Sequence, residues 1–267
     1  MAESSIRLSF FLGLFFLFAF LEIVFPKRKS VSSKVERWSA TAMLTLINTL
    51  STRFLFPLGA VGVSIYAQNQ NIGLFSQYES SSSWWFILSS IIFLDFIIYL
   101  QHVLFHHIGF LWQFHRVHHA EKDLDVSSGI RFHTIEILLS MAIKSLVILV
   151  FGLPPSAILI FEIILNGMAM FNHSNLRLNL RFDNSLRNVI VTPDMHRIHH
   201  SIVPKEAHSN FGFNLSIWDL IFNTYTAKPQ SPQETLILGD PHQETPSQQS
   251  IWFLLSYPFK NFKKKGN

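Results

Sequence analysis

The 267-residue chain contains no cysteine. This absence excludes disulfides, thiolate zinc sites, iron–sulfur clusters held by the protein and thiolate-ligated haem. Any metal ion bound by this chain must therefore be held by histidine, aspartate or glutamate.

Charge is also scarce, because only 14% of the residues are charged, whereas soluble globular chains carry about 25%. Apolar residues make up 49% of the chain and include 27 phenylalanines, and the mean hydropathy is +0.28. This balance favours a membrane protein over a soluble domain. The net charge of +4 is modest, so we interpret the basic excess as the flanks of membrane helices and expect no nucleic-acid partner.

Four apolar stretches approach or exceed the ~20 residues that a helix needs to cross a bilayer. They are Leu8–Phe25, Ala42–Tyr66, Trp84–His106 and Ile135–Phe171. Gly152-Leu153-Pro154-Pro155 interrupts the last stretch and predicts the turn of a helical hairpin, so we expect about four to five spans. A cleaved signal peptide is the alternative for the first stretch. We disfavour it, because the stretch exceeds a typical signal-peptide core and no A-x-A-like site follows.

Lys144 and Glu162 fall within the predicted hairpin, about ten and eight residues from its turn. A rise of ~1.5 Å per residue places them at similar depth. Since an unpaired charge inside a membrane is costly, we expect these side chains to face one another or the interior of the bundle.

The basic residues indicate an orientation. Lys27, Arg28, Lys29, Lys34 and Arg37 follow the first stretch, whereas Gln68–Ser83 contains no lysine or arginine. The positive-inside rule places the first of these loops, the end of the third span and the terminal Lys263-Lys264-Lys265 in the cytoplasm. We expect Gln230–Gln249 to be an irregular surface segment. Ile251–Phe259 is too short to cross and is predicted to lie at the membrane interface.

All 13 histidines lie between His102 and His242, and most of them form groups. The groups are His102 with His106; His115 with His118 and His119; the single His173; and His196 with His199 and His200. Positions i, i+3 and i+4 share one face of a helix, so each group can present its imidazoles together. We interpret His107, His208 and His242 as surface or outer residues.

Imidazole is a good ligand for iron, zinc, copper and nickel. One such ion commonly takes three to five protein nitrogens, so nine imidazoles exceed the needs of one ion and suit two. A pair of irons can share the electrons needed to cleave O2. A membrane metal transporter or metal store would also need clustered histidines, and a zinc hydrolase would need one three-ligand site with a general base.

The order H-x3-H, H-x2-H-H, H-x2-H-H resembles the fatty acid hydroxylase/sterol desaturase superfamily, and the flanking residues strengthen the likeness. The matching segments are Asp95, Tyr99 and His102; Trp112–His119; Arg131-Phe-His133-Thr-Ile-Glu136; Phe171-Asn-His173-Ser-Asn175; Thr192–Ser201; Asn210-Phe-Gly212; and Trp218–Tyr225. Thr134 replaces the usual proline and Asn223 the usual glycine. The resemblance covers about residues 95–225.

The resemblance implies an all-α membrane bundle capped by a cytosolic helical unit with a di-iron site, acting on a sterol, fatty acyl chain, carotenoid or ether lipid. It also implies two iron ions (zinc can replace them on purification), O2 as co-substrate and an external electron donor. The chain has no flavin-type G-x-G-x-x-G, so a cytochrome b5-like protein or a ferredoxin/reductase pair is the expected partner. We expect N-terminal membrane helices in residues 1–90, the catalytic domain in 91–227 and a tail with the interfacial segment in 228–267, in a bacterial inner membrane or the endoplasmic reticulum.

The predicted ligands are the nine grouped histidines, with His133 as either a tenth ligand or an outer hydrogen-bond donor. A ligating histidine usually donates its other N–H to a partner. The candidate partners are Asp95, Asp125, Glu136, Asp194 and Asp219, and the resemblance adds Tyr99 and Asn175. Asp219 is the candidate most expected to tie the helix of Trp218 to the rest of the cap. Arg116 and Arg197 are expected to pair with these acids.

Overall fold

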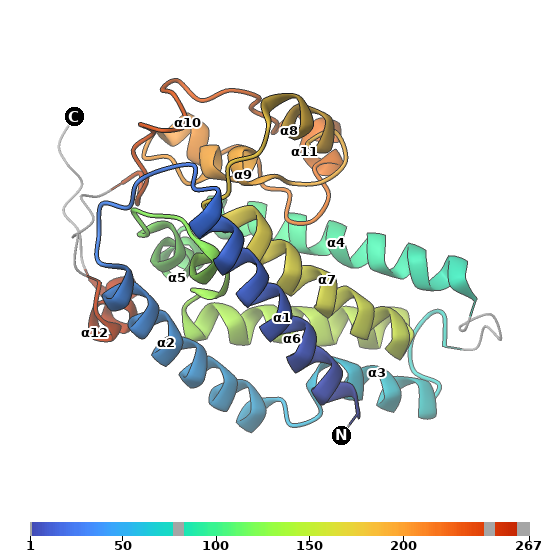
Figure 1. Ribbon diagram of the computed structural model, residues 1–267. Helices are drawn as coiled ribbons and strands as arrows, with labels where there is room; N and C mark the ends of the chain where they lie inside the picture. Colours follow the sequence, from blue (N-terminus) through green and yellow to red (C-terminus); the bar gives the residue numbers. More distant parts are fainter. Residues whose placement is uncertain (1, 77–82, 243–248, 261–267) are drawn as a thin grey trace.

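The computed structural model describes residues 2–76, 83–242 and 249–260. Within these ranges the chain is all-helical, and its only β-type pairing consists of three isolated bridges. Long helices form a bundle, and short helices gather at one end of it (Figure 1). The predicted all-α class is therefore confirmed.

Five spans in the described ranges are long and apolar enough to cross a membrane, which confirms the predicted four to five. They are α1 (Ala2–Val24), α2 (Lys34–Leu55) with α3 (Gly59–Asn69), α4 (Trp84–His107), α6 (Thr134–Phe151) and α7 (Pro155–His173).

The second span differs from its prediction, because it is not one helix over Ala42–Tyr66. Helix α2 ends at Leu55, Phe56 leaves the helical region with φ −126° and ψ 65°, and α3 begins at Gly59 with φ +62°. Pro57 is the cause, since proline disfavours helical backbone in the residue before it. Both α2 and α3 pack against α6, so they follow one another across the bundle.

The predicted hairpin is confirmed at its turn. Gly152 adopts φ +67° and ends α6, and Pro155 occupies the first turn of α7. The loop after α3 packs on this turn, where Leu74 N donates to Val150 O at 2.9 Å and Phe75 N donates to Phe151 O at 3.0 Å. These bonds satisfy carbonyls that the end of α6 leaves free, as backbone within a membrane requires.

The two charges within the hairpin meet as predicted. Lys144 Nζ lies 2.7 Å from Glu162 Oε1. The sequence did not indicate the second partner, because Arg7 Nη2 of α1 lies 3.0 Å from Glu162 Oε2. One carboxylate therefore joins α1, α6 and α7.

Short helices form the cap at the opposite end from the hairpin turn (Figure 1). They are α5 (Gly109–His119), η2 (Val126–Ile130), α8 (Leu180–Leu186), α9 (Pro193–His199), α10 (Pro204–Ala207), α11 (Ile217–Ile221), α12 (Ile251–Ser256) and η3 (Tyr257–Phe259). The predicted interfacial segment is α12 with η3, whose Phe253, Leu254 and Tyr257 pack in one cluster with Leu44 and Val117. The predicted basic cluster Lys263–Lys265 lies outside the described residues, as does part of Gln230–Gln249.

Candidate metal centre

Two consecutive helices at the cap end supply five of the grouped histidines. His102 and His106 lie one turn apart in the last part of α4, and His115, His118 and His119 lie in the second half of α5. The chain turns at Ile108, which is extended with φ −97° and ψ 110°. This single break brings the histidine face of α5 back against that of α4.

The other four histidines come from α7 and α9. His173 is the last residue of α7, and α9 carries His196 and His199, with His200 at its C-cap. Thr192 is the N-cap of α9, because its side chain accepts from Met195 N at 3.3 Å, and Pro193 follows in the first turn. These are ordinary helix-start signals, and they fix where the imidazoles of a seven-residue helix point.

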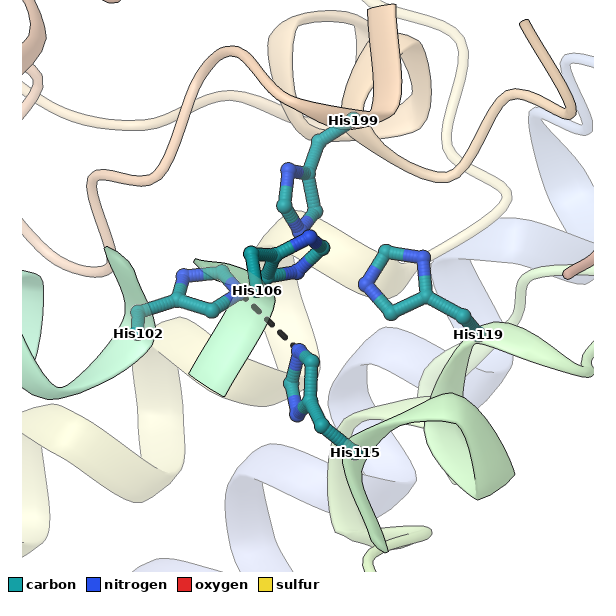
Figure 2. Close-up of side chains that lie close together, drawn as sticks. All are labelled: His102, His106, His115, His119 and His199. Atoms are coloured by element: carbon teal, nitrogen blue, oxygen red, sulfur yellow. Dashed lines mark hydrogen bonds between the residues drawn. The ribbon is translucent and has the colours of Figure 1, made fainter. Parts of the chain in front are cut away.

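The structure sorts the nine predicted histidines into two buried groups. Group A contains His102, His106, His115, His119 and His199, and group B contains His118, His173, His196 and His200. Within each group, one ligand nitrogen from every ring lies within 4.8 Å of all the others. Figure 2 shows the five rings of group A converging on one point from α4, α5 and α9. His119 and His200 stack at 4.4 Å between the groups.

Five rings are oriented by an acceptor at Nδ1. Four acceptors are main-chain carbonyls and one is a carboxylate: His102 Nδ1 lies 2.8 Å from Phe211 O, His118 Nδ1 3.2 Å from Arg131 O, His173 Nδ1 2.7 Å from Ala169 O, His199 Nδ1 2.7 Å from Ser209 O, and His115 Nδ1 2.7 Å from Glu136 Oε1. Since a carbonyl can only accept, each Nδ1 facing one must carry the proton. In a neutral ring, Nε2 then holds a free lone pair.

Several of these lone pairs point at one another. His118 Nε2 and His173 Nε2 are 2.9 Å apart, and His102 Nε2 and His115 Nε2 are 3.1 Å apart (Figure 2, dashed). With both protons committed at Nδ1, neither nitrogen in a pair can donate, so the contact is repulsive. A cation between the nitrogens would convert this repulsion into coordination.

The surroundings keep five of the cap imidazoles neutral. Burial lowers the pKa of His118, His119, His196, His199 and His200 well below the ordinary histidine value, and repulsion between neighbouring rings lowers it further. A neutral imidazole is the form that binds metal.

Other nitrogens of the two groups have no hydrogen-bond partner, although buried polar atoms normally have one. They are both ring nitrogens of His106 and His119, Nδ1 of His196 and His200, and Nε2 of His199. The donor set therefore fits two metal ions, one with up to five imidazoles and one with four. Iron and zinc accept such nitrogen ligands.

The remaining histidines lie outside both groups. His133 is the N-cap of α6, where its Nδ1 accepts from Ile135 N at 3.2 Å and its ring stacks on Phe114 at 5.4 Å. We therefore leave it out of the proposed ligand set. His208 is half-buried with its ring 5.6 Å from that of His106, while His107 and His242 are exposed.

Of the carboxylates that we expected beside the histidines, Glu136 alone has a recorded bond to a ring, at His115. Asp95 instead accepts from Trp218 Nε1 at 2.8 Å and from Leu215 N at 3.1 Å. Asp219 accepts from Phe211 N at 2.8 Å and Gly212 N at 2.7 Å. It therefore holds the residue whose carbonyl orients His102, and the prediction that it ties its helix to the cap agrees with this geometry.

The other candidates also bind residues other than histidine. Asp125 binds Arg37 and Trp38, Asp194 binds Lys27 and Arg197, Tyr99 bonds Thr224, and Asn175 bonds the main chain of Arg28. Arg197 pairs with an acid as expected, at 2.5 Å from Asp194. Arg116 donates to the carbonyls of Tyr257, Pro258 and Lys260.

Sequence reasoning missed the carbonyls of Phe211, Ser209 and Ala169 as partners, since every residue has a carbonyl and none leaves a signal in the sequence. It also missed the buried network behind His118. There Arg131 Nη1 lies 2.7 Å from Glu121 Oε2, and Arg37 Nη1 lies 3.3 Å from Glu121 Oε1. Both arginines had been given another explanation, because Arg37 was assigned to the basic cytoplasmic flank and Arg131 to the segment that resembles the family.

Several known proteins are similar to this chain. The chain is 30% identical over 144 residues to the ornithine lipid hydroxylase OlsE of Rhizobium tropici, covering 54% of this chain and 43% of the relative. It is 31% identical over 203 residues to the alkylglycerol monooxygenase of Caenorhabditis elegans, covering 74% and 38%, and 28% identical over 177 residues to that of Homo sapiens, covering 65% and 36%. The aligned regions thus span less than half of these relatives. No solved structure matches the chain significantly. Residues 87–224, just over half of the chain, match the family described as fatty acid hydroxylase, and the chain belongs to that family.

Proposed function

We propose that this protein hydroxylates a membrane lipid, using O2 and two iron ions held by groups A and B. The observation that carries the proposal is the convergence of nine buried imidazoles at one end of five apolar spans. Relatives with lipid hydroxylase and monooxygenase names support hydroxylation over desaturation. The overall reaction is RH + O2 + 2 e⁻ + 2 H⁺ → ROH + H2O.

In this proposal, His102, His106, His115, His119 and His199 hold one ion, and His118, His173, His196 and His200 hold the other. When bound, a pair of iron ions supplies the redox chemistry that activates O2. The chain's own contribution is to position the imidazoles and to exclude water. Main-chain carbonyls fix the ring orientations, Glu136 makes the imidazole of His115 a stronger donor, and burial of all nine rings keeps bulk water out.

We propose that the two electrons come from outside these 267 residues, which contain no flavin motif and no cysteine for a cluster. A cytochrome b5-like protein or a ferredoxin/reductase pair fits this requirement. We propose that the cap faces the cytoplasm, because the basic segment Lys27–Arg37, which ends in the first turn of α2, lies beside it. Lys27 there pairs with Asp194 of α9 at 2.9 Å.

A metal transporter or metal store is the alternative function. It would place acids and histidines along a path through the bilayer. The grouped histidines instead share one end of the bundle, and the membrane charges Arg7, Lys144 and Glu162 are paired with one another. A zinc hydrolase would need fewer ligands than the two groups offer.

The test is oxidation of lipid by purified, iron-loaded protein with a chemical reductant and ¹⁸O2. A hydroxylase incorporates one ¹⁸O atom into the lipid product. A desaturase gives a product that is two hydrogens lighter and carries no ¹⁸O. His118→Ala (group B) and His199→Ala (group A) should each abolish turnover. Retained turnover in either variant would overturn the ligand assignment, and metal flux into vesicles without lipid oxidation would favour the transporter.

A further inference from the structure

Helix α11 and its neighbours expose an apolar surface on the cap. We define the α11 patch as Val189, Ile217, Leu220, Ile221 and Phe222, all of them exposed. Val189 belongs to it because Ser216 N donates to Val189 O at 3.1 Å just before α11. Ile221 is 56% exposed and Phe222 48%. A group of large apolar side chains exposed together marks a surface that contacts another protein or a membrane.

Phe222 of the patch and the neighbouring Trp218 pack against the middle of α4 and not beside its end. Trp218 packs on Phe96 with ring centroids 4.9 Å apart, and Phe222 stacks on Phe96 at 5.9 Å and on Tyr99 at 5.5 Å. Asp95 accepts from Trp218 Nε1 at 2.8 Å. Phe96 is the thirteenth of the 24 residues of α4, and Figure 1 shows α11 over this helix.

The depth of Phe96 in the bilayer can be derived from the length of the helical hairpin. Helices α6 and α7 have 18 and 19 residues, so each is about 27–29 Å long, close to the ~30 Å thickness of hydrocarbon. With the hairpin turn at one boundary, His173 at the end of α7 lies near the other. His102 belongs to the neighbouring group, and Phe96 lies about 9 Å further into the bundle, six residues before it.

We infer that α11 and the α11 patch lie within the acyl-chain region of the bilayer, although they belong to the cap. The occupant of the patch is therefore lipid hydrocarbon. The main chain here is suited to that environment, because Ser216, Phe222 and Thr224 all donate their N–H groups to carbonyls. The buried Asp95 and Asp219 carboxylates accept from several N–H groups.

The inference goes beyond the proposed function and does not depend on it. If α11 lies in the bilayer, lipid contacts Phe222 about one helical turn from the rings of the proposed metal site. Phe222 covers Tyr99, whose hydroxyl lies 3.0 Å from Thr224 Oγ1, and Tyr99 precedes His102 by three residues.

The absence of cysteine makes a sharp test available, because one introduced cysteine is the only thiol in the chain. Ile221→Cys and Leu220→Cys are each reconstituted into lipid nanodiscs, where both membrane faces meet water, and treated with a charged maleimide that does not enter hydrocarbon. Leu88→Cys, exposed on α4 within the span, is the control for lipid contact, and Ser231→Cys, exposed on the cap, is the control for water contact.

We expect the Ile221→Cys and Leu220→Cys thiols to react at least ten-fold more slowly than the Ser231→Cys thiol, at rates close to that of Leu88→Cys. All four should react equally once unfolded in detergent. A nitroxide attached at Ile221→Cys, Leu220→Cys or Leu88→Cys should relax faster with O2, which partitions into lipid, than with a water-soluble nickel complex, and a nitroxide at Ser231→Cys should show the opposite order. Labelling of both patch variants as fast as Ser231→Cys would overturn the inference. Neither readout requires turnover, so the result is separate from the fate of the proposed function.

Discussion

Replacing Glu136 by glutamine removes the one carboxylate seen bonded to a ring in either group. Its Oε1 accepts from His115 Nδ1 at 2.7 Å, and Glu136 is 5% exposed. A glutamine can still accept this hydrogen bond, but it carries no charge and makes the imidazole a weaker donor to a metal. Mutating such outer partners typically lowers metal affinity or activity 10–100-fold, or about 1.4–2.7 kcal/mol.

Metal affinity of the detergent-solubilised protein, measured by titration against a chelator, is the assay. We expect Glu136→Gln to weaken one of the two binding steps by this factor and to leave the other unchanged, because Glu136 touches group A alone. Asp95→Asn is the matched control. It is another buried acid near the histidines, but its recorded bonds run to the segment that carries α11.

Equal affinities in the wild type and Glu136→Gln would refute the reasoning that this carboxylate strengthens a ligand. A loss of the same size in Asp95→Asn would show that any buried acid near the cap supports metal binding through folding alone.

Two further predictions concern stability. Glu162→Gln removes the carboxylate that pairs with Lys144 and leaves Arg7 with Glu3 alone, so it should destabilise the protein by about 3–5 kcal/mol. Lys144→Met should cost less, because Arg7 still pairs with Glu162; equal Tm values for the two variants would contradict this order. The metal-free protein should lose stability as pH falls below about 6.5, because the unfolded chain then binds protons that the buried cap histidines, with their lowered pKa values, do not. Each such histidine contributes about 1.4 kcal/mol per pH unit until its folded pKa is reached, so a Tm that stays flat between pH 7.5 and 5.5 would exclude neutral, buried rings.

Much of the fold and of the grouping of histidines could be predicted because both depend on local patterns. Apolar run lengths predicted the spans, and the breakers Gly152, Pro154 and Pro155 predicted the hairpin. The spacing of His115, His118 and His119 predicted that they share a region of one helix. In fact the helix divides them, with His118 in group B and the other two in group A. Helical spacing shows which side chains lie on the same side of a helix. Which ion each histidine can bind depends on which neighbouring helix faces it, and the spacing does not show this.

Glu136 was among the predicted partners and bonds His115, but the other partners of the rings could not be predicted, because they depend on tertiary packing. Asp95 is spaced from His102 as in the family, yet its carboxylate faces Trp218, while the main chain of Phe211 orients His102. The break at Pro57 was visible in the sequence, but the apolar run across it favoured one helix. The depth of α11 had no signal at all, since a five-residue helix carries too little pattern to indicate what it faces.

Metal content per chain is the most direct measurement. The two histidine groups predict two iron ions per chain in protein loaded with iron anaerobically, measured by elemental analysis against amino-acid analysis. His119→Ala and His200→Ala, one from each group, should each reduce that content, whereas His107→Ala, on the exposed surface, should not. A protein that oxidises lipid with fewer than two ions, or two ions retained when rings from both groups are removed together, would contradict a paired site built from these nine imidazoles.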